Sequence, residues 1–244
     1  MITDPTQLHH RYQKLYESET GNWIADLPDW NHWLTAEERC LWVHGIPGAG
    51  KSVLISHIID CVESHCQNSA FKHGLVYYYC YYGHTNNPDE AVPLLRWTIS
   101  QLCRQANQIP KTINQAFKNG RAPNVTDLLN ALEEILEHFD TVFVVVDAVD
   151  ESEPRDLLLL VLKDLVSKPR FAKLQILVSS RRYEDIKRVM HEIAVPVSMS
   201  NPYVEADIRH HVHSLLQKMD RFSRWPRYLL DEVEETVSRK AEGM

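Results

Sequence analysis

The sequence lacks the marks of a secreted, membrane-spanning or nucleic-acid-binding chain. Its longest apolar run is Leu157 to Leu162, far short of the ~20 residues that cross a bilayer as a helix, so no membrane segment is expected. The start of the chain is neither basic nor apolar, which gives no sign of a signal peptide and favours a cytoplasmic location. The net charge of −7 comes without any basic block, which argues against nucleic acid as a partner.

Cysteine and histidine give no clear disulfide or metal pattern. The five cysteines are an odd number and include no C-x-x-C pair, so free thiols in a reducing compartment are favoured over disulfides. The tightest histidine group is His210, His211 and His213. A helix points such close neighbours to different faces, so a solvated helix is favoured there over a metal site.

Glycine is scarce, with eight residues in the whole chain, yet three of the eight fall between Gly45 and Gly50. The segment Gly45–Ser52 fits the pattern G-x-x-x-x-G-K-[ST]. An apolar strand candidate, Cys40–His44, precedes it, and an amphipathic helix pattern follows it. We therefore predict that these residues bind nucleotide phosphates: Gly45, Ile46, Pro47, Gly48, Ala49, Gly50, Lys51, Ser52 and Val53.

The chemistry of a triphosphate explains these residue types. Several backbone N–H groups must converge on one small volume, and glycine lets the chain fold that tightly. The next helix then begins at the phosphates and turns its positive dipole end toward them. Lys51 supplies a positive charge to the β- and γ-phosphates, and the Ser52 hydroxyl is predicted to ligate Mg²⁺.

Two further strand ends carry candidate catalytic residues. Val142–Val146 is uniformly apolar, as a central strand should be, and it ends at Asp147, which is placed to hold Mg²⁺. Asp150 and Glu151 follow, and either carboxylate can orient or deprotonate the attacking water. Leu174–Ser179 leads to Arg181, which we expect to sense or stabilise the γ-phosphate. The predicted catalytic set is Lys51, Asp147, Asp150, Glu151 and Arg181.

Strand-like and helical patterns alternate between about residues 40 and 200, which predicts a parallel α/β sheet covered on both faces. Before it, Leu8, Tyr12, Leu15 and Tyr16 have helical spacing and predict an amphipathic lead-in. The tyrosine-rich run at 77–82 contains no basic residue, so it is read as an outer strand rather than a base-stacking surface. The five expected strands are Cys40–His44, Leu75–Tyr82, Val142–Val146, Leu174–Ser179 and Val195–Ser198.

Capping residues in the sequence also indicate where helices begin. Asn87 and Pro88 predict one start, with Glu90 completing a capping box. Thr126 is expected to cap a helix over Asp127–Phe139, and a further helix is expected over Pro154–Val166. Two more helices are expected near the end of the chain, over Tyr203–Lys218 and Tyr228–Ala241.

Taken together, the motifs at 44–54, 144–151 and 177–181 resemble the NACHT family of signal-transducing NTPases, of the class known as STAND. The likeness is to its fungal branch, the heterokaryon-incompatibility and NOD-like-receptor type, which overlaps with nephrocystin-like NACHT modules. The resemblance extends to 19–23, 30–34, 94–102 and 205–209. It implies a P-loop NTPase sheet of order 5-1-4-3-2, in which the Arg181 strand lies between the loop strand and the Asp147 strand.

The resemblance also implies a mechanism. Nucleotide binding and exchange would govern opening and self-association of a larger intracellular defence receptor, with slow hydrolysis as the reset. Effector and sensor domains of that receptor would be its partners. The bound nucleotide would be ATP/ADP or GTP/GDP with Mg²⁺, because no guanine-reading motif decides between them.

The expected organisation is a helical lead-in at 1–38, an NTPase core at 39–200 and the truncated start of a helical subdomain at 201–244. Two other functions remain open. A nucleotide-dependent scaffold would bind tightly with negligible hydrolysis, and a phosphotransferase would share the phosphate loop. The second is less favoured, because the chain shows no arginine-rich insertion of the kind that such enzymes use as a lid.

Overall fold

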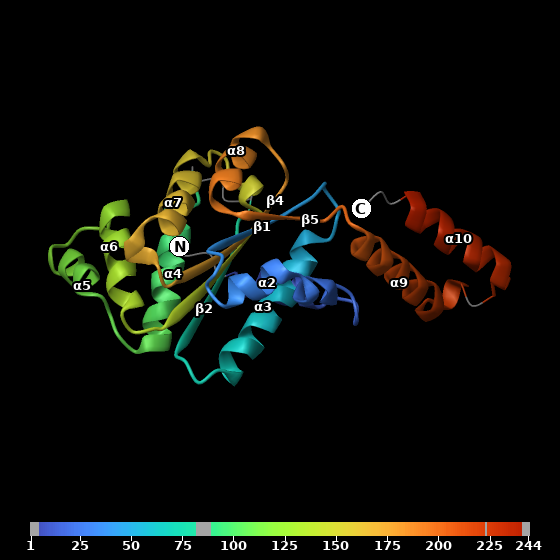
Figure 1. Cartoon of the computed structure of the whole chain (residues 1–244), viewed down its shortest axis with the longest axis horizontal. Coiled ribbons are helices and arrows are strands. Elements are labelled where there is room, and N and C mark those ends of the chain that lie inside the picture. The colour runs from blue at the N-terminus through green and yellow to red at the C-terminus, as the bar shows by residue number, and fades with distance from the viewer. Residues whose placement is uncertain (1–4, 82–88, 223, 241–244) are drawn as a thin grey trace.

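Five short strands form one parallel sheet in the computed structural model, which describes residues 5–81, 89–222 and 224–240 (Figure 1). The order is β2-β3-β4-β1-β5, which from the other edge reads 5-1-4-3-2, as predicted. The Arg181 strand, β4, thus lies between the loop strand β1 and the Asp147 strand β3. The strand bounds are Cys40–His44 for β1, His73–Tyr79 for β2, Thr141–Asp147 for β3, Leu174–Ser180 for β4 and Val195–Ser198 for β5.

Alternation along the strands divides the core into two layers. In β3, Val142, Val144 and Val146 point to one face of the sheet, while Phe143 and Val145 point to the other. The first face is covered by α4 (Ala91–Ala106), α6 (Val125–Leu136), α7 (Asp156–Ser167) and α8 (Glu184–Ile193). The second is covered by α2 (Pro28–Leu34) and α3 (Lys51–Asn68). A sheet buried on both faces needs continuous apolar strands, which is why these runs could be recognised.

The remaining short elements lie between these helices and strands along the chain. They are α5 (Lys111–Lys118), η2 (Val149–Glu151), η3 (Pro169–Phe171) and η4 (Asp220–Phe222). All five cysteines are free thiols. Within the described ranges, no helix has both the length and the apolar character needed to cross a membrane.

The lead-in before β1 docks on the second face of the sheet. It contains α1 (Thr6–Gln13), η1 (Asn22–Asp26) and α2. The predicted amphipathic face was wrong at its far end, since α1 ends at Gln13 and Leu15 is 57 % exposed. The predicted Leu8 and Tyr12 do pack on the core, and the Tyr16 ring stacks on His57 of α3. The unpredicted His9 adds a ring contact with Tyr79 of β2.

The helix pair α9 (Pro202–Lys218) and α10 (Arg227–Lys240) extends away from the sheet at the right of Figure 1. Its first helix is joined to the lead-in by two carboxylates, Glu17, which binds Ser214 and Lys218 of α9, and Asp207. Asp207 Oδ2 accepts hydrogen bonds from the backbone N–H of Gly21 at 2.7 Å and from the indole N–H of Trp23 at 3.1 Å. These two segments, distant in sequence, therefore form one wall beside the phosphate loop.

The start of α4 differs from the predicted capping box. Asn87 and Pro88 lie outside the described residues, and α4 begins at Ala91. The strand predicted over Leu75–Tyr82 is displaced in the structure: Tyr82 lies outside the described residues, but β2 already ends at Tyr79, before Cys80 and Tyr81. Glu90 makes no capping contact with its side chain. Its carboxylate accepts a hydrogen bond from the Tyr78 hydroxyl instead, because both groups are buried and each needs a polar partner.

The cap of α6 is Asn124, not Thr126 as predicted. The Asn124 side chain accepts a hydrogen bond from the Asp127 N–H at 2.9 Å, and the Asp127 carboxylate accepts one from the Asn124 N–H at 3.0 Å. This reciprocal pair is a capping box. Threonine is a common cap, and Thr126 stands directly before the predicted start at Asp127, but the helix begins two residues before that start, at Val125.

This correction gives a matched stability test. Asn124→Ala is expected to cost about 1 kcal/mol, because it removes the acceptor for an otherwise unpaired helix N–H. In a chain of this length that cost lowers Tm by about 2–4 °C. Thr126→Ala serves as the control and should leave Tm within about 1 °C by calorimetry, a difference typical of surface substitutions. Equal losses in the two variants would contradict the assigned cap.

Candidate functional site

The phosphate loop connects the end of β1 to the start of α3. At two of its positions, Gly50 and Gly45, the structure shows why a residue with a Cβ does not fit. Gly50 directly precedes α3 with φ of +79°, a left-handed conformation that side chains with a Cβ avoid. At Gly45 an added Cβ would stand 2.7 Å from Cβ of Met199. The loop therefore curves tightly between β1 and the segment after β5, and brings the N-terminus of α3 to the carboxyl edge of the sheet.

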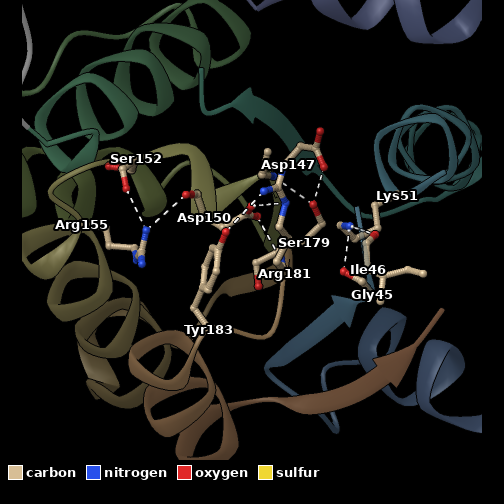
Figure 2. A network of polar contacts seen from close by, with 12 residues as sticks. Gly45, Ile46, Lys51, Asp147, Asp150, Ser152, Arg155, Ser179, Arg181 and Tyr183 are labelled. Atoms are coloured by element: carbon tan, nitrogen blue, oxygen red, sulfur yellow. Dashed lines mark hydrogen bonds and ion pairs between the residues drawn. The ribbon is translucent and has the colours of Figure 1, made fainter. Parts of the chain in front are cut away.

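Lys51 curls back over this loop (Figure 2). Its ammonium donates hydrogen bonds to the backbone carbonyls of Gly45 at 3.0 Å and Ile46 at 2.9 Å. Burial lowers the pKa of Lys51, while the carboxylates of Asp150 and Asp147 act in the opposite direction. The ammonium is thus held at the loop by contacts that an incoming phosphate oxygen can replace.

Asp147 stands at the end of β3 and is 1 % exposed. Its Oδ1 accepts a hydrogen bond from the Ser179 hydroxyl of β4, and the Ser52 side chain lines the same pocket. Burial raises the pKa of Asp147, against the effect of these two hydroxyls. A buried carboxylate beside a hydroxyl oxygen is the hard donor set that Mg²⁺ prefers, so Ser52 and Asp147 fit a magnesium ion.

Asp150 and Arg181 form an ion pair that a backbone hydrogen bond reinforces (Figure 2). The backbone N–H of Arg181 donates to Asp150 Oδ1 at 2.9 Å, and the Arg181 Nε lies 3.1 Å from Asp150 Oδ2. Both oxygens of Asp150 are therefore occupied, and its side chain is only 4 % exposed. Glu151, one residue later in η2, lines the same pocket as Lys51.

Arg155 was not predicted as a site residue from the sequence, yet its side chain holds the backbone of η2, the turn that carries Asp150. Its Nη1 donates to the carbonyls of Asp150 at 3.2 Å and Ser152 at 3.3 Å, while its Nε binds Asp185 Oδ2 of α8 at 2.6 Å. The residue precedes α7 and looks like an ordinary helix start in the sequence. Only the fold, which brings α8 beside η2, shows that Arg155 fixes the backbone that carries Asp150.

These residues surround a pocket of ≈ 250 Å³, in which the structure brings every predicted catalytic residue together. A second cavity of ≈ 330 Å³ adjoins it and shares Gly48, Ala49, Gly50 and Val53 with it. Mostly apolar walls from the lead-in and α9 surround this second cavity. One unpredicted side chain, Tyr12 of α1, also lines the smaller pocket.

Residues 19–181, about two thirds of the chain, match the family described as Nephrocystin 3, N-terminal. The chain belongs to this family. The matched range runs from the lead-in to Arg181 and so includes every predicted site residue of the nephrocystin-3-type module. A direct search of the curated proteins found no match.

Solved structures show the same fold at low identity. The ORC1 protein of Aeropyrum pernix, in complex with DNA, is 12 % identical, with a TM-score of 0.53 over 92 % of this chain. AMPPCP-bound DnaA from Aquifex aeolicus is 11 % identical, with a TM-score of 0.50 over 94 % of this chain. The nephrocystin-3-type chain spans 61 % of the length of each. The likeness establishes the P-loop NTPase fold.

One of these findings corrects the expectation about partners. The net charge of −7 had argued against nucleic acid, but ORC1, with the same fold, is in complex with DNA. Net charge and the lack of a basic block describe the chain as a whole, whereas DNA contacts depend on local surfaces. The exclusion of nucleic acid was therefore wrong.

Proposed function

We propose that this chain binds a nucleoside triphosphate with Mg²⁺ at Gly45–Ser52 and hydrolyses it slowly as a regulatory switch. The observation that carries the proposal is the pocket itself. Lys51, Ser52 and Asp147 come from segments about 100 residues apart and converge on one ≈ 250 Å³ volume beside the N-terminus of α3. A cationic side chain, a helix N-terminus and a hard oxygen pair suit a triphosphate and its metal.

The adjoining cavity is suited to the nucleoside. Its walls are mostly apolar, with Trp23 of the lead-in and Val204 and Ile208 of α9 among them, as small-molecule sites commonly have. It continues from the phosphate pocket through Gly48–Gly50. Adenine and guanine both have apolar faces, so ATP and GTP are both candidates.

For hydrolysis we assign different roles to the two neighbouring carboxylates. Glu151 is the candidate to orient the attacking water, because both Asp150 oxygens already hold Arg181. Asp150 then positions Arg181, whose guanidinium is the candidate to stabilise charge on the γ-phosphate. Mg²⁺, when held by Ser52 and Asp147, supplies Lewis-acid stabilisation of the phosphate oxygens.

We further propose that the switch acts on the rest of a larger protein, as in the NACHT-type defence receptors that the chain resembles. Support comes from the walls of the nucleoside cavity. The lead-in and α9 both line it, and Asp207 joins them. A nucleotide that binds one arrangement of these segments more tightly shifts the population toward that arrangement.

A first experiment identifies the base and the reaction. Purified protein is denatured and the released nucleotide identified, and binding of ATP and GTP and release of phosphate are then measured. Glu151→Ala is expected to lower phosphate release about 100-fold with nucleotide affinity changed less than about threefold. Asp150→Ala should lower both, because it also frees Arg181.

Each outcome decides between functions. Unchanged phosphate release in an Asp150→Ala/Glu151→Ala double variant rejects hydrolysis at this site and leaves the nucleotide-dependent scaffold. Phosphate appearing on an added nucleoside, rather than in water, would establish a phosphotransferase. Absence of ATP and GTP binding would reject the whole proposal.

A further inference from the structure

Tyr183 and Arg155 close a ring of contacts around Asp150 (Figure 2). Arg181, which is paired with Asp150, also donates a hydrogen bond from Nη1 to the Tyr183 hydroxyl at 3.3 Å. The Arg155 guanidinium lies over the Tyr183 ring, 5.2 Å from its centroid, and donates to the Asp150 carbonyl at 3.2 Å. The contacts thus run from the Asp150 carboxylate through two arginines and one tyrosine back to the Asp150 backbone.

Asp185, in the first turn of α8, anchors this ring. Its Oδ2 accepts a hydrogen bond from Arg155 Nε at 2.6 Å, and its Oδ1 accepts one from Nη2 at 3.4 Å. The third nitrogen, Nη1, donates to the carbonyls of Asp150 and Ser152, on either side of Glu151. Every nitrogen of the guanidinium is therefore used. A planar fork that is always charged is suited to bridge one carboxylate and two carbonyls.

These contacts relate two groups to which we assign roles in hydrolysis. Glu151 belongs to η2, a turn of three residues, and so short a turn depends on contacts with other elements for its position. Arg155 supplies such contacts on both sides of Glu151. The same guanidinium packs on Tyr183, whose hydroxyl meets Arg181. One side chain thus links the carboxylate proposed to orient water with the cation proposed to act on the γ-phosphate.

We propose that Arg155 is a positioning residue for hydrolysis, which is anchored on Asp185 and holds Glu151 and Arg181 in a fixed relation to each other. This inference rests on the proposed function. Hydrolysis joins the water oxygen to the γ-phosphorus, breaks the bond to the bridging oxygen and leaves the proton of water on the released phosphate. The water must therefore lie in line with the breaking bond. A displacement of about 1 Å at such a site can slow the reaction about 100-fold.

Arg155 should affect the rate rather than nucleotide binding. Among the described residues, those that line the phosphate pocket do not include Arg155, so it acts through its neighbours. Loss of a group that only positions the reacting atoms lowers the rate of the chemical step and leaves the affinity for the substrate nearly unchanged. This difference distinguishes the proposed role from a general loosening of the pocket.

The chain offers a matched control on the same two helices. Lys163 of α7 and Glu192 of α8 also form an ion pair, about two helical turns beyond Arg155 and Asp185. Lys163→Ala and Arg155→Ala each remove one positive charge and one ion pair involving α8. The hydrogen bond of Lys163 goes to Glu192, whereas those of Arg155 also reach the backbone of η2.

The first test measures phosphate release in a single turnover, together with the affinity for ATP and GTP. Arg155→Ala is expected to lower phosphate release about 10- to 100-fold, with affinity changed less than about threefold. Lys163→Ala should keep both within about twofold. An unchanged rate in Arg155→Ala, or equal losses in the two variants, would overturn the proposal.

Arg155→Lys gives a second variant that keeps the charge and its attraction to Asp185. One ammonium cannot serve a carboxylate and two carbonyls at once, so phosphate release should still fall about tenfold while Tm stays within about 2 °C of the wild type. Full activity in Arg155→Lys would show that only the charge matters and would contradict the positioning role.

A double variant tests whether Arg155 acts through Glu151. Once Glu151 is removed, little remains for Arg155 to position on that side of the ring. Arg155→Ala should then cost less than about threefold in the Glu151→Ala background, although it costs far more in the wild type. Two losses that simply multiply would show independent effects and reject the proposal.

Nucleotide binding and phosphate release of the wild type are measured before any variant. Absence of either would reject the proposed function and this inference with it. A wild type that hydrolyses ATP or GTP, beside an Arg155→Ala protein that does so equally fast, would reject this inference alone.

Discussion

Lys51→Ala is expected to lower the affinity for ATP or GTP on the order of 100-fold, because hydrogen bonds between charged groups are worth about 1.5–3 kcal/mol each. The protein itself should hardly be affected. Lys51 makes its hydrogen bonds to two carbonyls of its own loop, and water can hydrate those carbonyls once the side chain is gone. We therefore expect Tm to change by less than about 2 °C.

The measurement is a binding titration with and without MgCl₂, alongside calorimetry of the free protein. Lys72→Ala is the matched control. Lys72 directly precedes β2 at the opposite end of the strands from the phosphate loop, so its removal subtracts the same charge from the chain but not from the pocket. If Lys51→Ala kept full affinity, or both variants lost it equally, the phosphate loop would not be the binding site.

The sheet could be predicted because its strands are buried on both faces. The bounds of β1 and β5 were predicted to the residue, and β3 was one residue longer at each end. Uniform apolar runs bounded by polar residues leave little freedom in placing such strands. Helix ends were less predictable, as α6 shows, because Asn124, Thr126 and Asp127 all have side chains that can cap.

The site could be predicted only where chemistry demands a local pattern. Gly45–Ser52 must lie together in sequence because backbone N–H groups have to converge, and Asp147 must end a central strand. Arg155 and Tyr12 obey no such pattern. Their places at the site come from tertiary contacts, with Asp185 for Arg155 and with Tyr79 for Tyr12, and neither contact has a signature in the sequence.

Asp147→Asn is expected to stabilise the nucleotide-free protein. Burial raises the pKa of Asp147, so between its unfolded pKa, about 3.9, and its higher folded pKa the folded state binds more protons than the unfolded state. Stability then falls as pH rises through that window, and the cost of the buried charge is fully present above it. Asparagine avoids this cost and can still accept a hydrogen bond from Ser179.

The variant should therefore melt higher at pH 7, by about 2–4 °C for each kcal/mol relieved, and the difference should shrink as pH approaches 4. Thermal melts across this pH range measure both effects. A Tm difference that grew at low pH would contradict the assignment of the cost to the ionised Asp147.

The same substitution should have the opposite effect once ligand is present. Mg²⁺ with nucleotide stabilises whichever protein binds it, and the wild type offers the metal a charged oxygen that asparagine lacks. We expect Asp147→Asn to lose about 100-fold or more of its phosphate release and most of the Tm gain that MgCl₂ adds to the nucleotide complex. Ser179→Ala is the control, since it removes the neighbouring hydroxyl but keeps the carboxylate. If MgCl₂ stabilised both variants as much as the wild type, Asp147 would not hold the metal, and its buried charge would need another explanation.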